Sequence, residues 1–271
     1  MISIEDVIVT YPGADSPALD GVTLRIDAGE MVCLLGANGS GKSTLARLCN
    51  ALLVPGSGAV TVDGMDTADE SVLWEVRSRV GFVQQNPENQ IVGTVAEEDV
   101  AFGPENLGVA RDELRRRVDE ALEVVGLSGL QRREPHMLSE GQKQRLAIAG
   151  ALAMRPAYLV LDEPTAMLDG AGREDVSAVL RRLRADGVGI LHVTHHVGES
   201  IDADRIAVLD AGRIVYEGTP SLVLADVPLA ESLGIELPPV AHMNAALRER
   251  GIDVPALTLD AVSIVDAIWR S

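Results

Sequence analysis

The feature that most constrains this chain is a glycine-rich loop between a predicted strand and a predicted helix. Residues 36–43 read Gly-Ala-Asn-Gly-Ser-Gly-Lys-Ser and fit the pattern G-x4-G-K-[ST]. They follow the wholly apolar run 31–35, typical of a buried strand, and lead into 43–53, which has helical periodicity. In this setting, inward-pointing backbone N–H groups and a helix N-terminus form an anion site, so we predict a phosphate-binding loop.

Two side chains of this loop have expected roles in binding a nucleotide. Lys42 is expected to reach the β- and γ-phosphates, and the Ser43 hydroxyl is expected to be a ligand of Mg²⁺. The candidate nucleotide-binding residues of this segment are Gly36, Ala37, Asn38, Gly39, Ser40, Gly41, Lys42, Ser43 and Thr44.

A second candidate motif is a pair of carboxylates at the end of an apolar strand. Residues 158–161 read Tyr-Leu-Val-Leu, and Asp162 and Glu163 follow them directly. Open α/β sheets bind ligands at the carboxyl ends of their strands. Asp162 is therefore suited to hold Mg²⁺ through water, and Glu163 is suited to polarise an attacking water molecule. Alone, such a strand end is usually a solvated one, and the phosphate-binding loop favours the functional interpretation.

The order of predicted elements indicates an α/β core with a mostly parallel sheet. Ser139 is predicted to cap the helix that it precedes, and 18–21 is predicted to be a turn between the first two strands. The predicted strands are 2–11, 22–26, 31–35, 59–63, 80–83, 158–161, 189–194, 206–210 and 214–216, and the predicted helical segments are 43–53, 98–129, 139–154 and 174–186.

Composition limits the possible partners. The formal charge of −18 argues against non-specific binding of nucleic acid, because that binding depends on Lys and Arg neutralising phosphates. No apolar run approaches the roughly 20 residues of a membrane span, and residues 1–6 lack the pattern of a signal peptide. Cys33 and Cys49 are expected to be reduced and buried. We therefore expect a cytoplasmic protein that associates with a membrane only through a partner.

The segment 138–142, Leu-Ser-Glu-Gly-Gln, precedes a predicted helix upstream of the carboxylate pair. With this motif the chain resembles the ATP-binding-cassette (ABC) ATPases, whose signature is commonly Leu-Ser-Gly-Gly-Gln. The resemblance implies hydrolysis of ATP with Mg²⁺ by a P-loop NTPase fold, which has a RecA-like core, an antiparallel β subdomain and an α-helical subdomain at about 86–155. It implies an ABC ATP-binding domain at 1–218 and a small helical C-terminal extension at 219–271 that helps dimerisation.

The same resemblance assigns roles to four single residues. Tyr11 resembles the aromatic residue that stacks on adenine. Gln85 resembles the glutamine that contacts Mg²⁺ and the water molecule while sensing the membrane partner. Asp169 resembles the acid of the loop that crosses the dimer interface, and His195 resembles the switch histidine on the γ-phosphate.

Two of these assignments depend on a choice between adjacent, identical residues. Gln85 is preferred to Gln84 because the Asn-Pro pair of the family pattern follows it directly. His195 is preferred to His196 because the family usually has Thr-His-Asp, which places His196 at the acidic position.

The signature also explains why such ATPases work as dimers. It begins a helix, and a helix N-terminus is an anion site, but it lies too far from the phosphate-binding loop of its own subunit. In the family it binds the γ-phosphate held by the opposite subunit, here through Ser139, Gly141 and Gln142. Glu140 replaces the commoner glycine, and we expect its carboxylate to face outward while the backbone donates. With a different chain as partner, the site that uses this signature could be slower.

Two further segments resemble the ATPases of energy-coupling-factor (ECF) transporters for vitamins and for cobalt or nickel. Residues 85–103 resemble the part that forms a groove for the coupling helices of a transmembrane subunit, and 233–240 resembles the C-terminal extension that holds two ATPases together. The implied partners are a second ABC ATPase chain, the same or related, a transmembrane coupling subunit and a substrate-binding membrane subunit, at the cytoplasmic face of the membrane. One of three acids, Glu97, Glu98 or Asp99, is expected to pair with an arginine of the coupling helix, and Glu105 is nearby.

Three alternatives were weighed against this interpretation. The ATPase of a conventional ABC importer lacks the features of 85–103 and 233–240. A soluble ABC ATPase of DNA repair or translation carries long insertions or a second cassette, for which an acidic chain of 271 residues leaves no room. A P-loop kinase has no use for the signature or the switch histidine. The transported substrate and the choice between homodimer and heterodimer stay open, because the ATPase does not touch the substrate.

Overall fold

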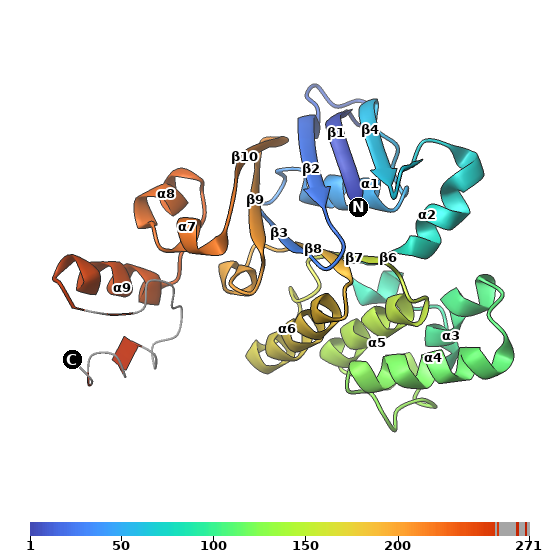
Figure 1. Cartoon of the computed structure of the whole chain (residues 1–271). Coiled ribbons are helices and arrows are strands. Elements are labelled where there is room, and N and C mark those ends of the chain that lie inside the picture. The colour runs from blue at the N-terminus through green and yellow to red at the C-terminus, as the bar shows by residue number, and fades with distance from the viewer. Residues whose placement is uncertain (253, 255–263, 266–268, 270–271) are drawn as a thin grey trace.

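The computed structural model describes residues 1–252, 254, 264, 265 and 269, and its core is two β-sheets with helices around them (Figure 1). The strands are β1 (Ile2–Val9), β2 (Leu19–Ile26), β3 (Met31–Leu35), β4 (Ser57–Val62), β5 (Met65–Asp66), β6 (Val80–Val83), β7 (Tyr158–Asp162), β8 (Gly189–Val193), β9 (Arg205–Asp210) and β10 (Arg213–Gly218). The α-helices are α1 (Lys42–Cys49), α2 (Leu73–Arg79), α3 (Ala96–Asn106), α4 (Arg111–Val124), α5 (Glu140–Ala153), α6 (Gly170–Ala185), α7 (Pro220–Leu224), α8 (Val227–Ser232) and α9 (Pro239–Glu249).

The larger sheet positions the candidate site. Its strand order is β10-β9-β3-β8-β7-β6, with β3, β6, β7, β8 and β9 parallel and β10 antiparallel to β9. The central strands β3, β7 and β8 are buried along their whole length, because helices cover both faces of a parallel sheet. Their carboxyl ends lie at one edge, and there the phosphate-binding loop, the carboxylate pair and the two histidines follow. The expected α/β fold of the P-loop NTPase kind is confirmed.

The smaller sheet is antiparallel, in the order β2-β1-β4-β5. The predicted turn at 18–21 is wrong, because Leu19, Asp20 and Gly21 lie inside β2. Gly21 lies at an irregularity in the pairing with β1, where the register shifts between Val7, opposite Val22, and Ile8, opposite Asp20. Gly21 takes a positive φ of 72° there, a conformation that glycine adopts without strain.

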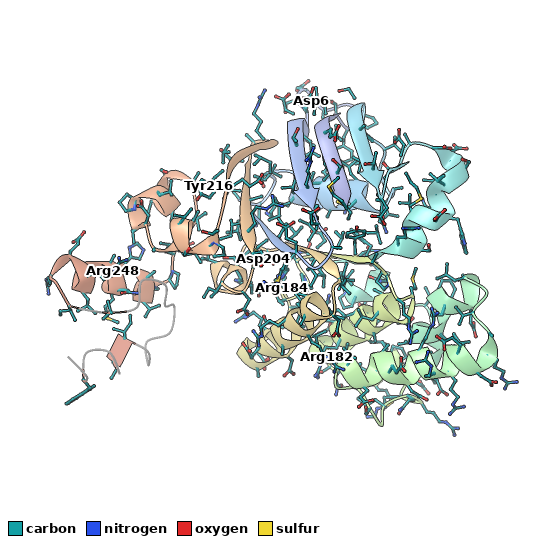
Figure 2. The ribbon with its side chains drawn as sticks, in the orientation of Figure 1. Asp6, Arg182, Arg184, Asp204, Tyr216 and Arg248 are labelled. Carbon is teal, nitrogen blue, oxygen red and sulfur yellow. The ribbon has the colours of Figure 1, made fainter. Side chains whose placement is uncertain are left out.

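Two apolar clusters hold the molecule together, one on each side of the larger sheet. One joins β1, β2 and β4 to α1, and the other joins α3–α6 to the underside of the sheet. Cys33 and Cys49 are fully buried free thiols, as expected. Figure 2 labels Arg184 of α6 and Asp204, which form an ion pair that fixes the end of α6 beside the start of β9.

The helices of 86–155 form a group of their own between β6 and β7. The predicted helical segment 98–129 is two helices, α3 and α4, which are separated by a turn at Leu107–Ala110. Ser139 caps α5 as predicted, and Gln142 completes a capping box with it. No helix in the described part of the chain is long and apolar enough to cross a membrane.

The segment after Gly218 begins with α7, α8 and α9, which lie beyond β10, at the opposite end of the larger sheet from α3–α5 (Figure 1). Val223, Leu224 and Ala230 are buried in the same apolar cluster as α5 and α6. The extension therefore packs on the main domain, at least through α8. Most of the stretch from 253 to 271, which the sequence assigns to this extension, lies outside the described residues.

Candidate functional site

A cleft of about 540 Å³ opens at the carboxyl edge of the larger sheet. It collects residues from the loops after β1, β3, β6, β7 and β8, which are far apart in sequence. Most of the residues that line it are predicted site residues, and Ala18 and Ala166 are additional. The lining residues are Tyr11, Ala18, Asn38, Gly39, Gly41, Lys42, Ser43, Thr44, Gln85, Glu163, Ala166 and His195.

The phosphate-binding loop needs glycine at two positions. A Cβ atom on Gly36 would lie 2.2 Å from the carbonyl oxygen of Leu209, and one on Gly41 would lie 2.4 Å from that of Ala18. Both glycines also have positive φ, 153° and 107°. The loop is thus held tightly against the neighbouring strand ends, and its backbone has the curvature that a phosphate cradle requires.

Lys42 begins α1 and its ammonium group lies inside the loop. Its Nζ donates to the carbonyl oxygens of Gly36, at 2.8 Å, and Ala37, at 3.0 Å. Its side chain is only 5 % exposed, and burial lowers the pKa of Lys42, while Glu163 and Asp162 act in the opposite direction. The cation is therefore held within reach of the cleft by bonds to neutral carbonyls, which a phosphate anion can replace.

Ser43 and Asp162 lie next to each other, although 119 residues separate them. The Ser43 hydroxyl donates to Asp162 Oδ1 at 2.9 Å. Burial raises the pKa of the Asp162 carboxyl, and the bond from Ser43 lowers it in part. A buried carboxylate beside a hydroxyl is a pair of oxygen ligands of the kind that Mg²⁺ prefers.

Glu163 is the centre of the site, with three groups around its carboxylate. Gln85 Nε2 donates to Glu163 Oε2 at 3.1 Å, and His195 Nδ1 lies 3.3 Å from the same oxygen. Lys42 Nζ lies 4.0 Å from the other oxygen, Oε1. Glu163 has a φ of 51°, in the left-handed region that non-glycine residues rarely adopt. The backbone is thus bent so that the carboxylate, 12 % exposed, faces the cleft.

The two residues of each adjacent identical pair, Gln84–Gln85 and His195–His196, have different positions in the structure. Gln85 reaches Glu163, whereas the backbone N–H of Gln84 donates to the side chain of Gln90. His195 lines the cleft and His196 does not. His196 is half-buried, and burial, together with the neighbouring His195, lowers its pKa.

Tyr11 lies at the mouth of the cleft, where it is 38 % exposed. Its hydroxyl and that of Thr44 are 3.1 Å apart and share a hydrogen bond. The exposed ring is free to stack on a planar group at the outer end of a phosphate chain that begins in the loop.

The predicted signature residues do not line this cleft. Ser139 accepts from the backbone N–H of Gln142 at the start of α5, and the Gln142 side chain accepts from that of Ser139. The Glu140 carboxylate accepts from Lys143 at 2.8 Å. Glu140 is half exposed, and the backbone N–H of Gln142 in the first turn is bonded to Ser139. The outward orientation of Glu140 in a dimer stays a prediction.

Asp169 is also outside the cleft. Its carboxylate accepts from the backbone N–H of Gly172 at 2.8 Å and caps α6. Gly141 and Asp169 are both solvent-accessible in this single chain. The lining of the cleft therefore includes most of the residues expected to act within one subunit and none of those expected to act across a dimer.

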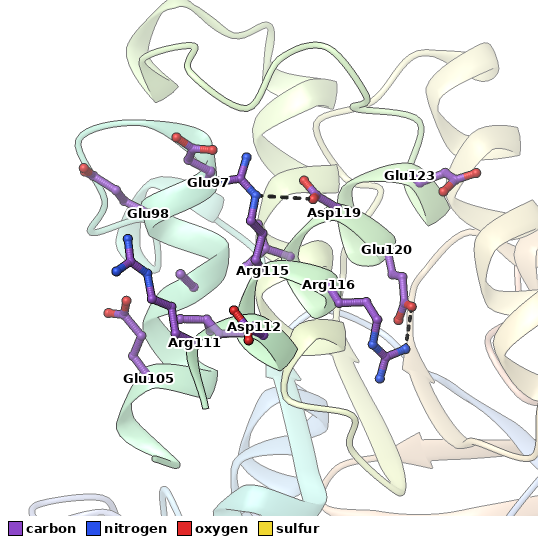
Figure 3. A pocket seen from close by; sticks show the side chains of 13 residues that line it. Glu97, Glu98, Glu105, Arg111, Asp112, Arg115, Arg116, Asp119, Glu120 and Glu123 are labelled. Atoms are coloured by element: carbon purple, nitrogen blue, oxygen red, sulfur yellow. Dashed lines mark hydrogen bonds and ion pairs between the residues drawn. The ribbon is translucent and has the colours of Figure 1, made fainter. Parts of the chain in front are cut away.

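A second cavity, of about 670 Å³, lies between α3 and α4 (Figure 3). Glu97, Glu98 and Glu105 project from α3 on one side, and Arg111, Arg115 and other charged residues project from α4 on the other. We call this the α3–α4 groove. Asp99 is not part of it.

Asp99, expected to be one of the acids that meet a membrane partner, has a structural role instead. It is buried, and its Oδ1 accepts from the backbone N–H groups of Val92, at 2.7 Å, and Gly93, at 2.9 Å. A carboxylate at the first turn of a helix binds such free N–H groups well, because the bonds are charge-assisted. The set of candidate acids is thereby reduced to Glu97, Glu98 and Glu105.

Comparison with known proteins agrees with this geometry. The family model described as ABC transporter matches residues 19–166. An energy-coupling factor transporter ATP-binding protein, EcfA1 of Symbiobacterium thermophilum, is 54 % identical over 254 residues, which are 93 % of this chain and 88 % of that protein.

Solved structures give the same result. CbiO1 from Clostridium perfringens, part of the ABC transporter complex CbiONQ, superposes with a TM-score of 0.78 at 34 % identity and covers 90 % of this chain and 98 % of its own. An ATP-binding cassette solved as a dimer in a post-hydrolysis state, bound to ADP and Pi, has a TM-score of 0.74 at 33 % identity and covers 81 % of this chain and 99 % of its own.

Proposed function

This chain belongs to the ABC transporter family of ATP-hydrolysing subunits, and from that premise we propose that it powers an ECF-type importer of a vitamin or a transition-metal ion. The observation that carries the catalytic part is the grouping of Lys42, Gln85 and His195 around the Glu163 carboxylate. The observation that carries the transporter part is the α3–α4 groove, in a segment that resembles the docking region of such ATPases.

ATP binding exchanges one set of bonds for another. Lys42 leaves the carbonyl oxygens of Gly36 and Ala37 and binds the β- and γ-phosphates, where opposite charges meet in a partly buried site. The backbone N–H groups of residues 36–44 surround the phosphates. Tyr11 stacks on the adenine. These groups orient the nucleotide so that its γ-phosphate points toward Glu163.

Mg²⁺ fits the donors that surround Ser43 and Asp162. Among the described residues no cluster of three or more His, Cys, Asp or Glu side chains forms a metal cage. That suits Mg²⁺, which keeps several waters and is held by one or two protein oxygens together with phosphate oxygens. Ser43, Asp162 and Gln85 would hold the ion, and it would neutralise charge on the phosphates during hydrolysis.

Hydrolysis depends on the carboxylate of Glu163. It accepts a hydrogen bond from the attacking water, orients the water in line with the γ-phosphate and receives its proton. Gln85 and His195 restrict the carboxylate to one orientation, since both contact the same oxygen. His195 also lies on the cleft side, where it donates to the γ-phosphate oxygens as charge develops on them.

The complete site needs two chains. Ser139, Gly141, Gln142 and Asp169 lie outside the cleft of their own chain and are available to the nucleotide of an opposite one, the same or related. ATP held between two chains closes the dimer, and hydrolysis opens it. We propose that the extension at 219–271 adds to the contact between the two ATPases, beside the ATP-binding domain at 1–218.

The membrane partner is a transmembrane coupling subunit, which works together with a substrate-binding membrane subunit. The α3–α4 groove accepts a helix of the coupling subunit, and Glu97, Glu98 and Glu105 pair with its arginine. The chain is thereby held at the cytoplasmic face of the membrane through its partner.

The test of the catalytic proposal is Glu163→Gln, which keeps the size of the side chain and removes its capacity to accept a proton. We expect ATP to bind with unchanged affinity while turnover falls by about a hundredfold or more. Glu70→Gln is the control, because Glu70 is an exposed acid on a different element. Equal turnover in wild type and Glu163→Gln would reject Glu163 as the base. Stimulation of turnover by DNA or ribosomes, and not by a membrane subunit, would reject the transporter.

A further inference from the structure

A carboxylate outside the cleft joins the two loops that carry Glu163 and His195. It belongs to Glu199, in the short 3-10 helix Val197–Ser200 that follows β8. Its side chain is only 6 % exposed. Sequence reasoning missed this residue, because an isolated acid four positions after a histidine has no motif of its own.

Each oxygen of this carboxylate is bonded to a different loop. Oε1 accepts from the hydroxyl of Thr165, at 2.6 Å, and Oε2 accepts from the hydroxyl of Thr194, at 2.7 Å. Thr165 is the second residue after Glu163 in the loop that leaves β7. Thr194 directly precedes His195 in the loop that leaves β8, which is the neighbour of β7.

The Thr194 hydroxyl extends the connection to the backbone beyond His195. It accepts from the backbone N–H of His196 at 3.0 Å while it donates to Glu199. The Thr194 hydroxyl therefore bonds the residue before His195 to the backbone of the residue after it. The Glu199 carboxylate orients this hydroxyl. Thr165 and Thr194 are each 1 % exposed, so water does not compete for these bonds.

Glu199 stays ionised in this environment. Burial raises its pKa, but the contact with His192 and the bonds from Thr165 and Thr194 outweigh burial and lower the pKa to about 2. His192 Nε2, from the buried strand β8, lies 3.4 Å from Glu199 Oε2. The carboxylate is thus a permanent acceptor of both hydroxyl bonds at any pH at which the protein works.

We propose that Glu199 is a positioning residue, which sets the distance between the Glu163 carboxylate and the His195 imidazole by bonding the loops that carry them. This inference rests on the proposed roles of Glu163 and His195. Glu199 does not touch the cleft, and it acts through Thr165 and Thr194. Its function is to keep the 3.3 Å contact between Glu163 and His195 when nucleotide enters and leaves.

Because Glu199 contacts other loops than those that bind the nucleotide, its loss is expected to affect the chemical step and not ATP binding. Nucleotide binding depends on Lys42, Ser43 and Tyr11, which lie after β1 and β3, and Glu199 contacts neither loop. Loss of Glu199 should therefore leave affinity for ATP unchanged and lower the rate of the chemical step. A displacement of reacting groups by about 1 Å can slow catalysis about a hundredfold.

The experiment compares a pair of variants at Thr165 with substitutions at Glu199. Thr165→Val keeps the shape and removes the hydroxyl, whereas Thr165→Ser keeps the hydroxyl and removes a methyl group. Glu199→Ala removes the acceptor for both loops. The matched control is Asp202→Asn, because Asp202 lies three residues after Glu199 and pairs with Arg181 on the surface. Each full-length variant is measured for ATP affinity, kcat and thermal unfolding.

We expect kcat to fall about ten- to a hundredfold in Thr165→Val and Glu199→Ala, with ATP affinity within about twofold of wild type. Thr165→Ser and Asp202→Asn should keep wild-type kcat. The double variant Thr165→Val with Glu199→Ala should be no slower than Glu199→Ala alone, since both remove one connection.

Two results would overturn the inference. One is a Thr165→Val protein as active as Thr165→Ser. The other is a loss of ATP affinity that matches the loss of kcat, which would indicate general damage to the fold. Glu199→Ala is not needed for this decision, so a folding defect in that variant leaves the test intact. Failure of the proposed function gives a different pattern, in which wild type and Glu163→Gln have the same turnover.

Discussion

At the scale of single residues, Glu163 combines an uncommon backbone conformation with a crowded side chain. Its φ of 51° turns the chain sharply after β7, and Pro164 and the buried Thr165 continue that turn inward. The same turn that places the carboxylate in the cleft also brings Thr165 to Glu199. The same turn thus connects the Glu163 carboxylate to the hydrogen bonds of Glu199.

The depressed pKa of Glu199 predicts a pH-dependent contribution to stability. In the unfolded chain the carboxyl has its ordinary pKa of about 4.5, whereas in the folded chain its pKa is about 2. Above pH about 5 the full contribution is present, and it is lost as the pH falls from about 4.5 toward 2. Glu199→Gln removes this contribution, which is at most roughly 3 kcal/mol.

Urea unfolding of wild type and Glu199→Gln at several pH values checks this prediction. The difference in the free energy of unfolding should be largest near pH 7 and should shrink by pH 3. A difference that is constant with pH would show that the charge of Glu199 makes no contribution, and that only its shape matters.

Residue roles could be predicted where they come in contiguous motifs. Lys42, Ser43, Asp162 and Glu163 each lie in a short pattern after a recognisable strand, and the structure brings all four together. Glu199 and Ala18 could not be predicted, because their roles come from contacts between distant segments. The function of Asp99 was misassigned because three adjacent acids look alike in a sequence, and only burial distinguishes the one that bonds to the backbone.

At the scale of elements, most strand and helix positions were predictable to within a few residues, since periodicity reports which face is buried. The short elements β5 and α2 were not predicted. The turn at 18–21 failed for a physical reason. Asp and Gly favour turns, but they also favour the irregular pairing that bends an antiparallel strand, and a single sequence does not distinguish the two. The connection that actually reverses the chain is longer and lies between Val9 and Leu19.

Two acids in the first turn of α3, the buried Asp99 and Glu97, are expected to differ in their contribution to stability. Asp99→Ala leaves the backbone N–H groups of Val92 and Gly93 without their charged acceptor. We expect a loss of about 2–4 kcal/mol in the free energy of unfolding, because hydrogen bonds to charged groups are among the stronger ones. Glu97→Ala, two residues earlier on the same helix, should change it by less than about 0.5 kcal/mol.

Chemical unfolding of the two variants beside wild type measures both values. Equal stability of Asp99→Ala and Glu97→Ala would mean that the loop at 90–95 finds other acceptors. Stability loss in Glu97→Ala would place that residue in the fold and remove it from the candidate docking surface.

At the scale of the whole molecule, the nucleotide cleft and the α3–α4 groove are separate features of one chain. The cleft lies on the sheet edge, and the groove lies on the group of helices between β6 and β7 (Figure 3). The groove carries more acids than arginines, and Glu97 and Glu105 project into it from α3. Its chemistry thus favours a partner helix that carries a positive charge.

Replacing the acids of the α3–α4 groove by neutral residues tests whether the groove binds a positively charged helix, and it leaves the nucleotide cleft unchanged. The triple variant Glu97→Gln, Glu98→Gln and Glu105→Gln should co-purify less with the membrane subunits and should lose their stimulation of ATPase activity. Basal turnover of the isolated chain should stay at the wild-type level, because none of the three residues lines the cleft. Undiminished co-purification would exclude these acids from the contact.

The place where the helical group joins the sheet determines how movement is shared between cleft and groove. Residues 86–155 leave the outermost strand, β6, and return to its neighbour, β7, so both of their chain connections lie at one end of the sheet. A rigid arm that swings about an axis moves each of its points in proportion to the distance from the axis. If the helical group turned about its connections to β6 and β7, Gln85 would shift little, while the groove and the signature would travel along wider arcs. In such a rotation, a small rearrangement at the phosphate would become a larger displacement of the groove.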